Sequence, residues 1–185
     1  MFQFNNKTIK QYINKCRGMT LIEVLVVVAI ILILLGAVVI NPRPSVNLDR
    51  AARQLASDLR RAQNMAMSAV EQGPIGSEYV PCGYGIYVTN STSYVLFYNN
   101  GGDCSTDTYK HNGSTDFETA DLGDIASGIT ITVGVGKSIY FIPPSGTTYI
   151  NGSEGGIVSQ NFTLAASDGS TRTVTVTSAG KIEIQ

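Results

Sequence analysis

Apolar and polar residues divide the chain into a basic leader, a long apolar run and a mixed remainder. Residues 1–18 contain four basic side chains and no acid, whereas residues 24–40 are apolar throughout. Residues 19–40 would form a helix of about 33 Å, which is enough to cross a hydrocarbon core about 30 Å thick. Basic residues before such a span keep that end cytoplasmic. The pattern therefore predicts a transmembrane helix over residues 19–40.

A second helical period follows two prolines, which should kink or interrupt the first helix. Small and apolar side chains recur there every three or four positions and form a narrow stripe: Leu48, Ala52, Leu55, Leu59, Ala62, Ala66 and Ala69. Arginines occupy the opposite side, either simply solvated or facing acidic neighbours in an assembly. We expect an amphipathic helix that begins near Ser45 or Asn47 and stops at the Gly73-Pro74 pair.

Beyond residue 83 the helical period gives way to short runs of β-branched and aromatic residues. Strands are predicted over residues 84–89, 93–98, 129–133, 137–142, 157–165, 171–177 and 181–184. The first six should pair in sequence order as three hairpins, because turn residues separate the members of each pair. The polar, acidic stretch over residues 101–124 is expected to be a long loop with little regular structure.

The predicted fold class is α+β. A long amino-terminal helix, with a transmembrane half and an amphipathic half, would pack on an antiparallel β-sheet head domain. The expected segments are a leader over residues 1–18, a transmembrane and assembly helix over 19–40, the amphipathic half over 41–72 and a β-rich head over 73–185.

Glu23 directly precedes the apolar run of residues 24–40. A charged residue deep in a bilayer costs about 2.5–3.5 kcal/mol on insertion scales, so this carboxylate indicates a function. A secretory signal peptide is one alternative, although the apolar run is longer than the usual 7–15 residues or so. A plain signal anchor is the other. Neither alternative gives Glu23 a purpose.

One contiguous motif carries a family resemblance: Gly18-Met19-Thr20-Leu21-Ile22-Glu23. Followed by an apolar helix, it resembles the class III leader of type IV pilins and type II secretion pseudopilins. The resemblance implies that the prepilin peptidase cuts between Gly18 and Met19 and methylates the new amino terminus at Met19. It also implies that Glu23 acts in subunit assembly, by meeting the terminal amine of a neighbouring subunit in a filament.

The order of elements narrows the resemblance. A long helix followed only by short strands is similar to the GspH/FimT group of minor pseudopilins and minor pilins. Residues 51–63 look like the second half-helix of that group, and residues 178–182 resemble its terminal hairpin. Methionine after the glycine is less usual in the wider family than phenylalanine.

Charge is distributed unevenly along the chain. From residue 71 onward there are 4 basic and 11 acidic side chains, a balance of −7. Nucleic-acid binding needs clustered positive charge. This acidic head offers no such cluster, apart from one that Arg172 and Lys181 could form. Nucleic acid is therefore a disfavoured partner.

The three cysteines fall in different parts of the chain. Cys16 lies in the leader, whereas Cys82 and Cys104 lie in the part expected to be exported. A disulfide between these two would add about 3 kcal/mol by the chain-entropy estimate, and an oxidising compartment favours it. The alternative is two separate small apolar residues. Their spacing does not resemble a zinc site.

The sequence contains few residues that indicate catalysis or metal binding. His111 is the single imidazole of the chain, and we interpret it as an ordinary surface residue in a polar loop. The acidic residues between positions 103 and 124 could bind calcium through oxygen ligands, but their spacing does not match an EF-hand and a solvated loop is favoured. We expect no enzymatic activity, no cofactor and no metal.

The favoured function is that of a minor pseudopilin or pilin in a type II secretion or type IV pilus machine, which helps to initiate or cap the filament. Its partners would be the prepilin peptidase, the inner membrane and other pilin-like subunits bound through the apolar helix. The head would lie in the periplasm or outside the cell. Two alternatives are a DNA-capturing minor pilin and a periplasmic protein with an uncleaved anchor.

Overall fold

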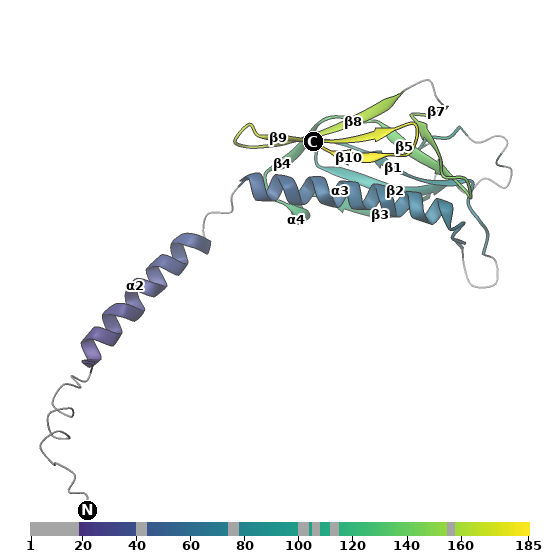
Figure 1. The fold of residues 1–185 in the computed structure, drawn as a ribbon. Helices are drawn as coiled ribbons and strands as arrows, with labels where there is room; N and C mark the ends of the chain where they lie inside the picture. Colours follow the sequence, from purple (N-terminus) through teal and green to yellow (C-terminus); the bar gives the residue numbers. More distant parts are fainter. Residues whose placement is uncertain are drawn as a thin grey trace, which may run out of the picture. The chain divides into compact units, whose positions relative to one another are not determined.

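A computed structural model describes residues 19–39, 44–73, 78–99, 104, 108–111, 115–154 and 158–185. The chain forms two compact units, Met1–Pro42 and Arg43–Gln185 (Figure 1). The leader with Gly18, residues 41–43 of the predicted break at residues 41–44 and part of the acidic loop lie outside the described residues. The first unit contains helix α2 (Leu21–Val39), and the second contains helix α3 (Pro44–Met67), a short helix and two antiparallel sheets.

Helix α2 forms where the sequence is almost purely apolar, and it begins directly after Thr20. Within the described residues, no helix reaches the length and apolar character that crossing a membrane requires. The predicted span over residues 19–40 ends outside those residues.

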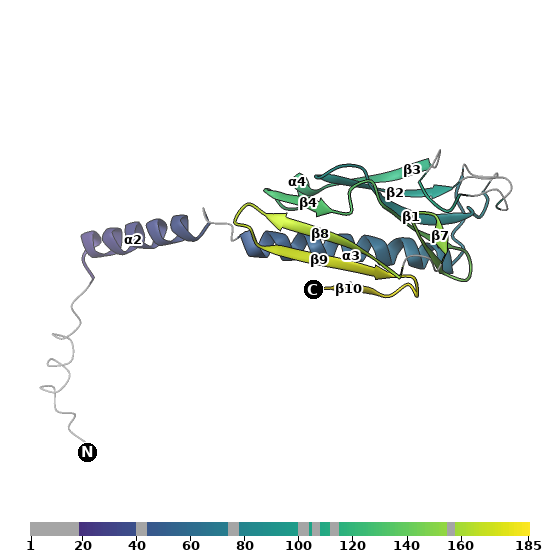
Figure 2. The ribbon, with the colours of Figure 1, turned by 90° about the horizontal axis from the view of Figure 1, so that it is seen from above.

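Helix α3 is amphipathic, as the stripe predicted. Six of the seven stripe residues are fully or almost fully buried: Leu48, Ala52, Leu55, Leu59, Ala62 and Ala66. Ala51 and Ala56 widen the buried face. The helix contacts strands of both sheets along its length (Figures 1 and 2). The alanines let the backbone of α3 approach the sheets closely.

The end of α3 differs from the prediction. The helix stops at Met67, well before Gly73. The N–H of Ala69 donates to the carbonyl of Ala66 (3.0 Å) and the N–H of Val70 to that of Met65 (3.1 Å). Ala69 has a left-handed φ of 46°. These two bonds form a Schellman motif with alanine at the position that glycine usually occupies, so the sequence carried no glycine to mark this helix end.

The larger sheet has six strands in the order β3-β2-β1-β5-β6-β7. Their bounds are β1 (Gly83–Val88), β2 (Ser93–Asn99), β3 (Thr115–Asp121), β5 (Ser138–Ile142), β6 (Thr147–Ile150) and β7 (Ser153–Glu154). The hairpin of β1 and β2 forms as predicted. Strand β3 pairs with β2 inside the stretch expected to be a loop, and helix α4 (Leu122–Ile125) follows it, so that expectation was wrong. Strands β6 and β7 were not predicted.

The smaller sheet has four strands in the order β10-β9-β8-β4. Their bounds are β4 (Ile129–Val133), β8 (Ser159–Ala166), β9 (Thr171–Thr177) and β10 (Ile182–Ile184). Strands β8 and β9 form the predicted hairpin. The predicted hairpin of β4 and β5 is wrong, because β4 pairs with β8 and β5 pairs with β1. Gly134, at φ 100°, turns the chain between the two sheets where a Cβ atom would overlap the ring of Phe162.

The two faces of the six-stranded sheet bury different side chains. The face toward α3 contributes inward residues such as Tyr84, Ile86 and Leu96 to the main core. The opposite face carries a separate aromatic cluster of Phe97, Tyr140 and Tyr149, against which Tyr87 and Tyr109 pack. The six-stranded sheet is therefore covered by side chains on both faces.

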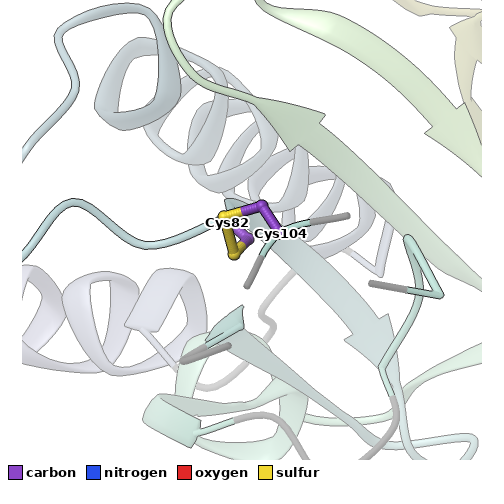
Figure 3. The surroundings of a disulfide bond; sticks show 2 residues. All are labelled: Cys82 and Cys104. Carbon is purple, nitrogen blue, oxygen red and sulfur yellow. A yellow bond between two sulfur atoms is a disulfide. The ribbon is translucent and has the colours of Figure 1, made fainter. Parts of the chain in front are cut away.

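The disulfide that the sequence favoured joins Cys82, just before β1, to Cys104, which follows β2 (Figure 3). The two Cα atoms are 5.2 Å apart. The N–H of Cys82 also donates to the carbonyl of Asn99 at the end of β2 (3.1 Å). The bridge thus fastens the chain that leaves the β1–β2 hairpin to the start of that hairpin.

Candidate functional site

The first turn of α2 is capped by the side chain of Thr20. The N–H of Glu23 donates to the carbonyl of Thr20 (3.0 Å) and to the hydroxyl of Thr20 (3.3 Å). Thr20 is therefore the N-cap and Glu23 stands at the third helical position, which is the spacing of a capping box. A carboxylate in the first turn also interacts favourably with the helix dipole. The position of Glu23 in the first turn thus also favours the start of α2.

Apolar side chains are exposed along α2 wherever the structure describes them. All of those from residue 21 to residue 35 are exposed, with Leu21 82% and Ile33 72% accessible. Contiguous apolar surface on this scale indicates contact with another protein or with lipid. Met19 lies just before the helix and is 63% exposed. The predicted site residues Met19 and Glu23 therefore lie within one helical turn of each other, at one end of an apolar surface.

Two of the four arginines of α3 contact strands of the head, whereas the side chain of Arg53 is 75% exposed, as the solvated interpretation expects. Arg61 forms an ion pair with Glu118 of β3 (2.5 Å), and Arg60 donates to the carbonyl of Ile182 in β10 (3.3 Å). These contacts join the helix to one strand of each sheet. Part of the arginine face therefore holds α3 in place.

Asp49 links the start of α3 to the smaller sheet. Its carboxylate accepts from Arg172 of β9 (3.0 Å) and from Arg53 one turn along the helix (3.2 Å). The hydrogen bonds from Arg172, and secondarily from Arg53, lower the pKa of Asp49 below its ordinary value. Arg172 is thus engaged in an ion pair, which argues against the basic cluster with Lys181 that the sequence left open. Lys181 pairs instead with Glu183 (2.6 Å).

Asp116 and Asp121, two of the acidic residues weighed as calcium ligands, have partners within the head. Asp116 contacts the imidazole of His111 (2.8 Å), and the side chain of Asp121 accepts from the N–H of Gly123 at the start of α4. Within the described part of the chain, no three potential metal-binding side chains come together. Asp103 and Asp107 lie outside it.

His111 is not the simple surface residue that the sequence suggested. Its ring stacks on Tyr87, with centroids 4.4 Å apart and planes within 2°, and it meets the edge of Phe97 at 5.0 Å. Its side chain is only 23% exposed. The segment after the disulfide thus places the imidazole on the outer face of the six-stranded sheet.

Sequence reasoning missed a buried carboxylate between α3 and β2. Asp58 is 5% exposed and accepts hydrogen bonds from the hydroxyl of Tyr94 (2.6 Å) and the amide of Gln54 (3.1 Å). The only available signal was the position of Asp58 directly beside the apolar stripe. Its partner in β2 is 36 positions away, and no local pattern connects the two.

Comparison with known families supports the interpretation of the amino terminus. The family described as the prokaryotic N-terminal methylation motif matches residues 13–39. No curated protein and no solved structure matches the chain significantly.

The chain is therefore a type IV pilin-like or pseudopilin-like protein that carries a class III prepilin leader. Such a leader implies processing by the prepilin peptidase and assembly with other pilins, a structural rather than a catalytic role. The architecture agrees with this class, because long helices precede antiparallel sheets and α3 packs along both of them.

Proposed function

We propose that the chain is a minor subunit, of the GspH/FimT type, of a type II secretion pseudopilus or a type IV pilus. Before assembly it is anchored in the inner membrane by residues 19–40, with the head on the periplasmic side. Cleavage after Gly18 removes the four basic residues of the leader and creates a methylated amine at Met19. The subunit then enters the filament, where it helps to initiate or cap the assembly.

The observation that carries this proposal is the position of Glu23 at one end of an uncovered apolar helix. The terminal amine of one subunit can approach Glu23 of a neighbour once the apolar side chains of the two helices pack together. Two unit charges about 4 Å apart attract by about 4 kcal/mol at an effective dielectric of 20, an attraction that desolvation offsets. Such a pair would chiefly fix the axial register of the subunits.

The amino terminus of the native protein tests processing directly. We expect mass spectrometry of the protein purified from its own membranes to show a chain that begins at Met19 and carries one methyl group. An intact leader would refute the proposal and favour a plain anchor. A start at any other residue would also refute it.

Substitutions of Glu23 separate its two roles. Glutamine can replace glutamate in a capping box but carries no charge. If Glu23 pairs with an amine, Glu23→Gln and Glu23→Ala should both reduce incorporation into filaments at least tenfold while cleavage proceeds, as measured by immunoblots of sheared filaments and of membranes. Normal incorporation of Glu23→Gln alongside defective Glu23→Ala would instead assign the residue to capping. Arg53→Gln, on the exposed side of α3, is the matched control.

A further inference from the structure

The head contains a polar hollow at the edge of the larger sheet where β1 ends and β5 begins. It has a volume of about 410 Å³, which is within the usual range for sites that hold small ligands. Side chains from four separate segments line it, together with Gly136: Tyr87, Lys110, His111, Lys137, Ser138 and Asn151. The pairing of β5 with β1 and with β6 brings three of these segments together.

Half of the few positive charges of the acidic head lie around this hollow. From residue 71 onward the chain has four basic side chains, and two of them, Lys110 and Lys137, line this hollow together with the only histidine. Among the described residues, neither lysine forms an ion pair, whereas Arg172 and Lys181 both do. No described carboxylate therefore neutralises either ammonium group, and both side chains are exposed.

The walls of the hollow are held in place by bonds within the head. Asn151 accepts from the N–H of Ser138 (2.9 Å) and donates to Gln160 (3.3 Å). Tyr87 and His111 are stacked on each other, and the carboxylate of Asp116 contacts the ring nitrogen Nε2 of His111 (2.8 Å). Thr108 and Lys110 pass close over Gly152, where a Cβ atom would lie 2.7 Å from the carbonyl of Thr108. These walls are ordered before a ligand binds, so the entropy cost of binding falls mainly on the two exposed lysine side chains.

We propose that this hollow binds a single carboxylate of a protein partner, presented as a glutamate or aspartate side chain in a peptide segment with few other charges. Lys110 and Lys137 would hold the carboxylate, and the Tyr87–His111 stack would contact the adjoining peptide. The net charge of the head decides against a polyanion. Repulsion grows with the charge of the ligand, so a balance of −7 opposes nucleic acid or a phosphate dianion more than a monoanion.

The single histidine provides a specific probe of this site. The full chain in a neutral detergent, labelled with ¹³C at histidine Cε1 and without an affinity tag, gives one imidazole signal. We expect the peptide acetyl-Gly-Glu-Gly-amide to move that signal saturably at constant pH and ionic strength. The uncharged analogue acetyl-Gly-Gln-Gly-amide should not move it.

Charge-removing variants locate the binding groups. Lys110→Gln together with Lys137→Gln should weaken binding of the glutamate peptide about tenfold without changing the melting temperature, because both side chains are exposed. The control Lys181→Gln removes a lysine from the other sheet and should leave binding unchanged. The proposal is overturned if the glutamine peptide binds equally well, if the double variant keeps full affinity, or if inorganic phosphate binds more tightly than the glutamate peptide.

Discussion

The hydroxyl of Tyr94 in β2 donates a hydrogen bond of 2.6 Å to the carboxylate of Asp58 in α3. Both groups are buried, and Gln54 is the other side chain seen to donate to this carboxylate. A buried carboxylate is stable only when hydrogen bonds replace its lost hydration. This contact therefore fixes the position of α3 against the larger sheet at one point, among the apolar side chains that the two elements bury.

Tyr94→Phe should destabilise the head by about 1–3 kcal/mol, because it leaves a buried acceptor with one donor fewer while preserving the ring. The free energy of unfolding in urea, followed by circular dichroism of the full chain in detergent, measures this loss. Tyr87→Phe is the control, since its ring lies on the opposite face of the same sheet. Equal stability of Tyr94→Phe and the parent protein would show that the bond contributes nothing.

The same contact predicts instability at alkaline pH. Burial, and then the hydrogen bond to Asp58, raises the pKa of Tyr94 far above its ordinary value of about 10. Below about pH 10 the phenol is protonated in both the folded and the unfolded chain, and its contribution to stability is complete. Above that pH the unfolded chain releases the proton and the folded chain keeps it, so the free energy of unfolding falls.

Between pH 9 and pH 11 the parent protein should therefore lose about 1.4 kcal/mol more than Tyr94→Phe. Urea titrations at the two pH values measure the difference, and the other tyrosines are common to both proteins. Parallel pH dependences of the two proteins would contradict the assignment of this loss to Tyr94.

Patterns in the sequence predicted the parts of the fold that depend on neighbouring residues. The stripe on α3 was evident because helical spacing puts its members on one face. The β8–β9 hairpin was evident because Asp168-Gly169 marks its turn, where Asp168 accepts from the N–H of Ser170 (2.9 Å). The class III motif could also be identified from the sequence, because its residues are contiguous.

Contacts between distant segments could not be predicted in this way. The strand β3 is polar on most positions and has no alternating pattern of its own, so its pairing with β2 left no local signal. The β4–β5 connection looks like a hairpin because only turn residues separate the two strands, yet they enter different sheets. The polar hollow likewise combines four segments that are far apart in the chain.

Gly85 allows the aromatic cluster to lie against β1. A Cβ atom at Gly85 would be 2.3 Å from the carbonyl of Ile139 and 2.7 Å from the ring of Phe97. Gly85→Ala should therefore destabilise the head by about 1–3 kcal/mol or more, because β1 and β5 must separate locally. Gly169→Ala is the control for adding a methyl group, since its Cβ atom meets nothing within 4 Å and only its φ of 84° opposes the change.

The melting temperatures of the two variants measure the difference. Gly85→Ala should melt lower than Gly169→Ala, which bears a backbone penalty of about 1–2 kcal/mol for its left-handed conformation. A Gly85→Ala variant that melts at the parent temperature would show that the aromatic cluster repacks without loss.

Ala69→Gly should make the head more stable. Ala69 holds a left-handed φ of 46° in the Schellman motif that ends α3, a conformation that glycine adopts without the strain of a Cβ atom. We expect a gain of about 1 kcal/mol, less the entropy that glycine adds to the unfolded chain. Ala66→Gly, three residues earlier, should instead destabilise the head, because Ala66 is helical and fully buried. The free energies of unfolding of the two variants should therefore change in opposite directions, and a loss of stability in Ala69→Gly would contradict the proposed helix end.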